Sequence, residues 1–173
     1  MDRQPDVLAT LRRTRQIRQF TDEPVADDDL HEILNVARWS GSSGNWQPWR
    51  FHVIRDADTQ ARLAELAPNA RHVAGAALII AIQMPGEKPA AESFDEGRVA
   101  ERILVAAMAV GLGAAIGWVM GSAREGVVEL LGLTPPAYVR TMVSIGHPAP
   151  QAQKPKAAPG EARKPLSELV IEH

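Results

Sequence analysis

Three apolar runs constrain the fold of this chain more than any other feature of the sequence. Residues 77–83 (ALIIAIQ) are apolar at all but the last position, which predicts a strand covered on both faces. The runs 114–121 and 139–146 predict two further strands, and residues 49–54 (WRFHVI) predict a fourth. Because stretches with helical spacing separate these strands, we expect an α/β or α+β sandwich with helices packed against one central sheet.

The segments between the strands carry apolar residues at the spacing of amphipathic helices. In the first of them, Val7, Leu8 and Leu11 are expected to face inward. Residues 84–95 are rich in proline and glycine and predict a surface loop, and residues 15–25 are too polar and irregular to be core. Helices are expected over 5–14, 27–39, 56–67, 95–113 and 123–132, with one further turn over 69–76.

Two of the expected helices start with side chains of the capping type. Asp27 or Asp29 stands where a carboxylate can accept the unpaired amides of the second helix. Ser122, with Glu125 three residues later, forms the capping-box pattern at the last helix. We therefore expect side-chain caps at both positions.

The composition excludes several classes of protein. The 173 residues are the size of one domain, and the absence of cysteine excludes disulfides, thiolate nucleophiles, iron–sulfur clusters and cysteine zinc sites. A formal charge of −2 gives no sign of nucleic acid or an anionic membrane as a partner. Glycines break the apolar stretch 103–121, so we interpret it as a buried helix and strand. Since no signal-peptide pattern opens the chain, a cytoplasmic location is expected.

The chain changes character after Gly146. Residues 147–165 are rich in proline, alanine and basic residues without periodicity, and the last residues become apolar again. Such a segment cannot pack a core of its own, so we expect it to dock on something else. The expected organisation is one domain over residues 1–147 and an extended arm over residues 148–173.

An arginine cluster is the first candidate for a binding site. Arg12, Arg13, Arg15 and Arg18 lie within seven residues, directly after a helix. Arginine is favoured where several oriented donors hold a phosphate. The alternative is a solvated helix face whose positive C-terminal end suits the helix dipole. The segment alone leaves both interpretations open.

A Gly/Ser/Asn loop between tryptophans is the second candidate. Its glycines would let a flat ligand approach the backbone, and its hydroxyl and amide groups would orient that ligand. The alternative is a polar turn whose flanking tryptophans fill the core or a subunit interface. The polar residues are Ser40, Ser42, Ser43 and Asn45, and the tryptophans are Trp39, Trp46 and Trp49.

Two weaker signals lie further along the chain. Asn69, Arg71 and His72 stand between a helix stop and a buried strand, where an ordinary surface turn would also explain them. Glycines gather at 111–121, and close helix–strand packing explains them at least as well as ligand approach does. The histidines lack metal-ligand spacing, so no metal site is expected, and neither a phosphate-binding glycine loop nor a nucleophile motif is present.

Taken in order, five segments resemble the nitroreductase family of FMN-binding flavoproteins. They are TRQIRQFTDEPV, GSSGNWQPWRFHVIRD, AVGLGAAIGWVMG, LLGLTPPAYVRTMVSIGHP and ARKPLSELV, and the match extends over nearly the whole chain, in the order of the family. The resemblance implies an α+β fold with a central mixed, mostly antiparallel sheet flanked by helices. It also implies a homodimer with two FMN sites at the subunit interface and a C-terminal arm that extends onto the partner.

The resemblance implies which residues contact the FMN phosphate and the ring. The phosphate contacts are Arg15, Gln16 and Arg18, with Arg163 near the C-terminus, while Thr14 replaces an arginine of the family. The loop residues that would face the flavin, held mainly by the other subunit, are Ser42, Ser43 and Asn45. Gly41 here replaces a proline of the family.

Two further segments complete the implied site. Asn69 and His72 match an asparagine and a lysine that contact the pyrimidine edge, and Arg71 is a second candidate for the missing positive charge. Ile116 and Gly117 match the segment whose backbone amides face the reactive edge of the ring.

The implied chemistry belongs to the cofactor. NAD(P)H would deliver a hydride to flavin N5, and a nitroaromatic, quinone or similar acceptor would then take it in a ping-pong mechanism. No catalytic side chain is required. Other chemistry on the same fold (flavin fragmentation, dehalogenation or heterocycle oxidation) ranks lower, because the segment 84–94 is too short for a substrate-specific lid. A non-enzymatic flavin-binding dimer is a further alternative.

Overall fold

A four-stranded antiparallel sheet in the order β1-β2-β4-β3 is the centre of the computed structural model, which describes residues 7–153 and 163–173. Every named strand pairs antiparallel with its neighbours, and the parallel pairing among the described residues is one bridge between Gln16 and Ala114. The strands are β1 (Arg50–Ile54), β2 (Leu78–Met84), β3 (Gly113–Trp118) and β4 (Tyr138–Gly146). The expected α+β class and central sheet are confirmed.

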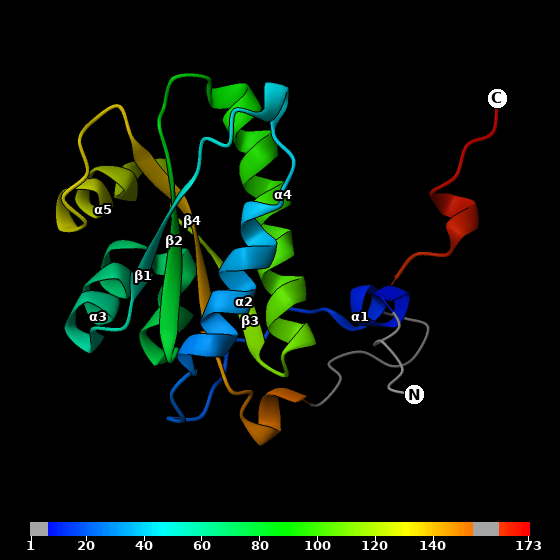
Figure 1. Ribbon diagram of the computed structural model, residues 1–173, viewed down its shortest axis with the longest axis horizontal. Coiled ribbons are helices and arrows are strands. Elements are labelled where there is room, and N and C mark those ends of the chain that lie inside the picture. Colours follow the sequence, from blue (N-terminus) through cyan, green and yellow to red (C-terminus); the bar gives the residue numbers. More distant parts are fainter. Residues whose placement is uncertain (1–6, 154–162) are drawn as a thin grey trace.

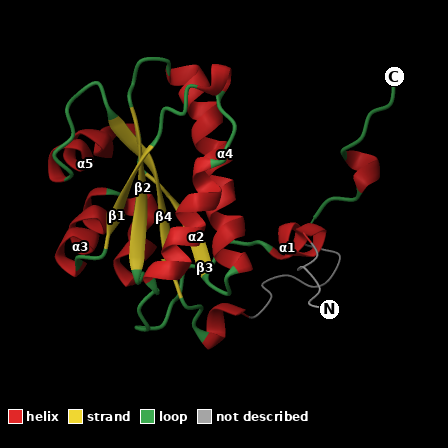
Figure 2. Cartoon of the chain, in the orientation of Figure 1, coloured by secondary structure: helices red, strands yellow, loops and turns green. Residues whose placement is uncertain are grey.

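Helices cover both faces of the sheet (Figures 1 and 2). Alternate residues of β2 point to opposite faces, so Ile80 and Ile82 join one apolar cluster while Ile79 and Ala81 join the other. This is why 77–83 is an unbroken apolar run. The first cluster packs against α2 and α4, and the second against α3, α5 and η2.

The helices are α1 (Val7–Arg13), α2 (Asp27–Arg38), α3 (Ala57–Leu66), α4 (Pro89–Ala109) and α5 (Arg124–Leu130). The short 3-10 helices are η1 (Ser43–Asn45), η2 (Pro68–Gly75), η3 (Gly121–Ala123), η4 (Pro150–Gln153) and η5 (Leu166–Glu168).

The start of α4 corrects the expected surface loop over 84–95. The helix begins at Pro89, where the missing amide hydrogen of proline costs nothing. Its first turn is held by Glu92, whose two carboxylate oxygens accept the backbone amides of Gly86 (3.0 Å) and Lys88 (2.7 Å). The connection from β2 is therefore only a few residues long.

Both expected side-chain caps are wrong. The residue before α2 is Ala26, which makes no side-chain cap, and Asp27 instead pairs with Arg55 at 2.8 Å. Near Ser122 the chain first forms η3, and the residue before α5 is Ala123. The acidic residues in the first turn of α2 still interact favourably with the positive end of the helix dipole.

The burial of the N-terminal segment also differs from expectation. Val7, Leu8 and Leu11 are exposed, because α1 lies to one side of the sheet and helices (Figure 1). Conversely, Ile17 is buried although its segment is polar. Among the described residues, no helix is long and apolar enough to cross a membrane.

Candidate functional site

The segment after α1 lies on the open edge of β3. The Ile17 amide donates to the Ala114 carbonyl at 2.9 Å, and the Ile116 amide donates to the Gln16 side-chain oxygen Oε1 at 2.6 Å. Ile17 packs over Gly113, where an added Cβ would lie 2.7 Å from an Ile17 carbon. The segment is therefore fixed at Gln16 and Ile17.

Gly117 lets η2 approach the same strand. A Cβ at Gly117 would lie 2.6 Å from the Cβ of Ala70, so a larger residue would push η2 away from β3. The residues of η2 therefore lie close to β3. Of the two explanations that the sequence allowed for these glycines, close packing and ligand approach, close packing accounts for Gly113 and Gly117.

His72 carries an unsatisfied group in this region. Its ring nitrogen Nε2 is buried and has no hydrogen-bond partner among the described residues. Burial lowers the pKa of His72, Arg18 lowers it further, and the Ala115 carbonyl acts in the opposite direction. The interactions with Arg18 and Ala115 place His72 near both, with an imidazole that favours the neutral form.

The structure thus brings together Gln16, Arg18, His72, Ile116 and Gly117 along β3, a set we call the edge group. Arg15 is exposed one residue before Gln16, and Asn69 and Arg71 are exposed on η2. The group offers amide, guanidinium and imidazole nitrogens with no carboxylate among them. The guanidinium and amide donors suit a ligand that has negative charge and carbonyl-type acceptors, whereas the free Nε2 of a neutral His72, whose other ring nitrogen donates to Ala115, accepts a hydrogen bond. The Ile116 amide itself is already bonded to Gln16.

The Gly/Ser/Asn loop is held in an unusual backbone conformation. Gly44 (φ 57°), Asn45 (φ 56°) and Gln47 (φ 51°) all adopt left-handed angles, which are uncommon for residues with side chains. Strain of this kind persists where the surroundings enforce it and is concentrated at binding sites.

Hydrogen bonds inside the loop leave donor groups available. The Ser42 hydroxyl oxygen accepts the Gln47 amide at 2.8 Å, and the Asn45 side-chain oxygen accepts from Gln47 Nε2 at 3.2 Å. The Ser42 hydroxyl hydrogen and the Asn45 amide nitrogen can therefore donate to a ligand. Ser43 and Asn45 are exposed and Ser42 is partly exposed.

The tryptophans around the loop have different roles. Trp49 is buried in the core. The Lys88 ammonium lies over the Trp46 ring, 4.7 Å from the ring centre. Trp39 is 70% exposed and borders a hollow of about 370 Å³ beside the loop, with Asn45 and Gln47 in its wall. A second hollow of about 360 Å³, between Trp49 and Pro136, contains none of the predicted site residues.

One chain does not bring the loop and the edge group together. In Figure 1, η1 lies beside the start of α4 and the segment around Gln16 lies toward its other end. The 21 residues of α4 make it ~30 Å long at the usual helical rise. Arg163 is exposed, and the described C-terminal segment 163–173 that carries it extends past α1, away from the sheet, in Figure 1.

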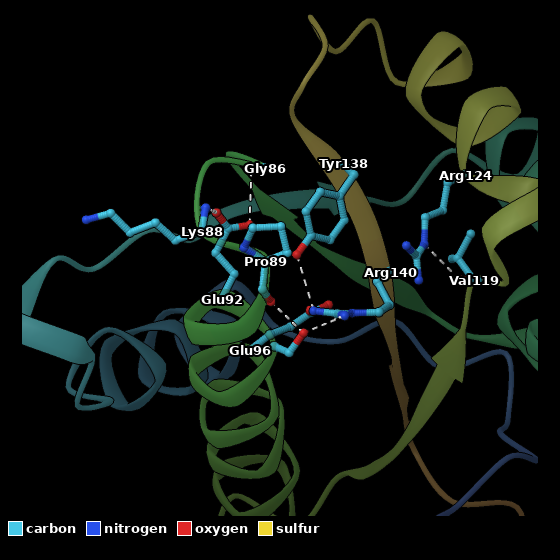
Figure 3. Close-up of polar contacts among 10 residues, drawn as sticks. Gly86, Lys88, Pro89, Glu92, Glu96, Val119, Arg124, Tyr138 and Arg140 are labelled. Atoms are coloured by element: carbon cyan, nitrogen blue, oxygen red, sulfur yellow. Dashed lines mark hydrogen bonds and ion pairs between the residues drawn. The ribbon is translucent and has the colours of Figure 1, made fainter.

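A buried charge network near the loop was missed by the sequence reading. Glu92, Asp95 and Glu96 are at most 2% exposed, and Glu96 Oε2 accepts from Arg140 Nε at 2.8 Å. Figure 3 shows the Arg140 guanidinium between Glu96 and Tyr138. Burial, opposed by Arg140, raises the pKa of Tyr138 to about 12. The available signal was Arg140 itself, because an arginine in an apolar strand requires a buried carboxylate.

Comparisons with known proteins point to one family. A model described as "Nitroreductase family" matches residues 11–71. An Archaeoglobus fulgidus protein described as "Putative NADH dehydrogenase/NAD(P)H nitroreductase" is 30% identical, over 83% of this chain and 86% of its own length. "FMN reductase [NAD(P)H]" from Bacillus subtilis is 29% identical, over 91% of this chain and 72% of its length.

Solved structures agree with these relatives. A "putative nitroreductase in complex with fmn" from Desulfovibrio desulfuricans is 32% identical, with a TM-score of 0.80 and 98% of both chains covered. An "FMN-dependent Nitroreductase" from Clostridium difficile has a TM-score of 0.85 at 23% identity, over 96% of this chain and 99% of its own, and supports the fold.

Proposed function

The chain belongs to the nitroreductase family, and we propose that it is an FMN-dependent oxidoreductase that transfers a hydride from NAD(P)H to nitroaromatic, quinone or similar acceptors. The observation that carries this function is the edge group, which is rich in donors and has a buried, unpartnered imidazole nitrogen in His72. An FMN molecule supplies a phosphate and ring carbonyls for the donors of this group, and a ring N–H from which the free His72 nitrogen can accept.

The residues present fit FMN. Arg15 and Arg18 would hold the phosphate by charge-assisted hydrogen bonds, and Gln16 would donate from its amide nitrogen while its oxygen binds Ile116. Arg163 would reach the phosphate from the C-terminal arm. On the other side of the ring, Ser42, Ser43 and Asn45 would donate from the strained loop.

His72 and Asn69 would orient the pyrimidine edge of the ring. His72 is partly buried while Arg71 is exposed, so we assign the ring contact to His72. The bound cofactor supplies the hydride chemistry. Arg71, beside His72 on η2, would supply positive charge near that edge, where it would stabilise the added negative charge of reduction. No side chain has to act as nucleophile or base.

The separation of the two groups supports a homodimer with shared sites. The loop of one protomer would meet the edge group of its partner, which makes each FMN site complete only between two chains. The apolar residues of the C-terminal segment, including Leu166 (75% exposed) and Ile171 (80% exposed), are suited to an arm on the partner. Residues 1–147 and the arm 148–173 then belong to one dimeric unit.

The early start of α4 bears on the acceptor. Because residues 89–95 are helical, even less chain remains for a substrate-specific lid than the sequence indicated. We therefore propose small acceptors that enter and leave freely, in place of the alternative chemistries on this fold.

Absorption spectroscopy tests this function. The purified protein, loaded with FMN, should show a flavin spectrum that bleaches on anaerobic addition of NADH or NADPH and returns with a quinone. A protein that retains FMN but is reduced by neither nicotinamide would contradict the reductase and leave the flavin-binding dimer.

A further inference from the structure

Gly41 lies directly against a guanidinium group. An added Cβ at this position would lie 2.2 Å from Nη2 of Arg98, closer than real Cβ contacts. The family that the sequence resembles has proline at this position. In this chain the guanidinium of Arg98 occupies the space that a side chain at position 41 would need. A side chain at position 41 would therefore force the end of Arg98 to move.

Arg98 is paired with a buried carboxylate. Its Nη1 lies 3.6 Å from Oδ1 of Asp95, one turn earlier on α4. The Asp95 side chain is 1% exposed, whereas that of Arg98 is 45% exposed. The arginine thus balances the charge of an acid that water cannot reach.

The second oxygen of Asp95 holds the loop. Oδ2 accepts the backbone amide of Ser43 at 3.0 Å, across 52 residues of sequence. Ser43 is the first residue of η1, and Ser42 gives that helix no side-chain cap. Asp95 therefore supplies from α4 the cap that the loop does not provide for itself.

This contact acts on the part of the loop that a ligand would touch. The Ser43 amide belongs to the peptide that joins Ser42 to Ser43, so fixing it limits where the Cα–Cβ bonds of both serines can point. The adjoining residues Gly44 and Asn45 have left-handed angles, which relax unless the ends of the turn are anchored.

We propose that Asp95 is a positioning residue for the cofactor site, and that Arg98 and Gly41 complete its clamp on the Ser42–Asn45 loop. The inference rests on the proposed function, because the loop residues are those assigned to the flavin. It adds a dependence on α4 that is absent from the motif resemblance. The clamp acts through the loop and does not touch the ligand.

Asp95→Asn is the first test, because it keeps the shape of the side chain and removes its charge. Titration of the apo full-length dimer with FMN, followed by flavin fluorescence, should show a Kd about tenfold weaker, typical of a lost charge-assisted contact. Glu101→Gln removes an exposed carboxylate from the same helix and should leave Kd unchanged. The unfolding temperature of each apo protein separates a loss of binding from a loss of fold.

The Gly41/Arg98 pair gives a second test that a structural role for Asp95 would not reproduce. Gly41→Ala should weaken FMN binding by displacing Arg98. Adding Arg98→Ala should remove the clash, so the double variant should bind FMN as Arg98→Ala does. Strict additivity of the two changes in binding would overturn the clamp. If Asp95→Asn does not fold, Arg98→Ala alone tests the clamp, because it removes the cation beside Asp95, and an unchanged Kd for FMN would then overturn the proposal.

The outcomes separate the two proposals. If wild-type protein does not bind FMN, the proposed function falls and the inference falls with it. If wild-type protein binds FMN and Asp95→Asn binds it equally well, the inference is overturned and the function stands. Weaker binding by Asp95→Asn, with Kd unchanged in Glu101→Gln and a non-additive Gly41/Arg98 cycle, supports the clamp.

Discussion

The edge group on β3 and the charge network at the start of α4 differ in the charges that they contain and in how far those charges are buried. Near α4, carboxylates are buried and bonded to Arg140 and to the amides of Gly86, Lys88 and Ser43. On β3, Arg18 is exposed and a buried nitrogen of His72 has no partner among the described residues. The first region holds a loop in place, and the second is the region to which we assign an anionic ligand.

The contrast has one exception on each side. Oxygen Oε1 of Glu96 is buried without a partner among the described residues, so the α4 network has an unmatched acceptor. On β3, Gln16 already uses its oxygen on the Ile116 amide. The difference therefore lies in the charges: the carboxylates near α4 face Arg98 and Arg140, whereas the edge group contains no carboxylate.

The largest effect is expected from Arg140→Ala, which leaves Glu96 buried without its cation. Breaking such a pair from one side costs roughly 3–5 kcal/mol of the free energy of unfolding. Urea denaturation measures this loss. Arg55→Ala is the control, because the Arg55–Asp27 pair is largely exposed and such pairs contribute about 0–1 kcal/mol. Equal losses in the two variants would contradict the network.

Arg18→Ala tests the edge group through binding. Removing a charge-assisted phosphate contact should weaken FMN binding by about 1.5–3 kcal/mol while folding changes little. A titration with FMN gives this value directly. Arg62→Ala, an exposed arginine on α3, should bind FMN normally. If Arg18→Ala retains wild-type affinity, the edge group does not hold the phosphate.

Gly117→Ala tests whether close packing places η2. The new methyl group would overlap the Cβ of Ala70, and overpacking of this kind costs roughly 1–3 kcal/mol. Gly97→Ala on the exposed side of α4 meets no atom within 4 Å and should be neutral or stabilising, since alanine favours helix. Thermal unfolding of both variants checks the contrast, and a neutral Gly117→Ala would rule out the packing role.

The smallest expected effect is a pH dependence from His72. Because burial and Arg18 lower its pKa in the folded state, the unfolded chain gains this proton first as the pH falls. His72 therefore favours stability above about pH 6.5, and this contribution is lost as the pH drops below that value. His72→Asn should reduce the slope of stability against pH measured by urea denaturation at several pH values, and an unchanged slope would contradict this role.

The sequence predicted what periodicity and local chemistry determine. The apolar run 77–83 gave β2, and Gly113 and Gly117 were correctly open to a packing explanation. Pro85, Gly86 and Pro89 led us to expect a surface loop where the first turns of α4 lie. Glu92 caps a helix start, which no local pattern predicted, and Asp95 is buried because Ser43 and Arg98 meet it in three dimensions.

The same limit applies to the N-terminal segment. Val7, Leu8 and Leu11 have the spacing of a buried face, yet one chain leaves them exposed, since periodicity does not say which surface covers a helix. The sequence also did not predict that the guanidinium of Arg98 lies against Gly41. Partners distant in sequence therefore account for most of what the sequence did not reveal.

Mixed dimers test most directly whether each site combines two protomers. One protomer would carry Arg18→Ala and the other Asn45→Gly, a change that keeps the left-handed backbone and removes the amide. With different affinity tags on each, the mixed dimer can be isolated and titrated with FMN. If the sites are shared, one site has both defects and the other is intact, so wild-type affinity returns for one site. If both sites of the mixed dimer bind as weakly as the parent variants, the loop and the edge group do not meet across the interface.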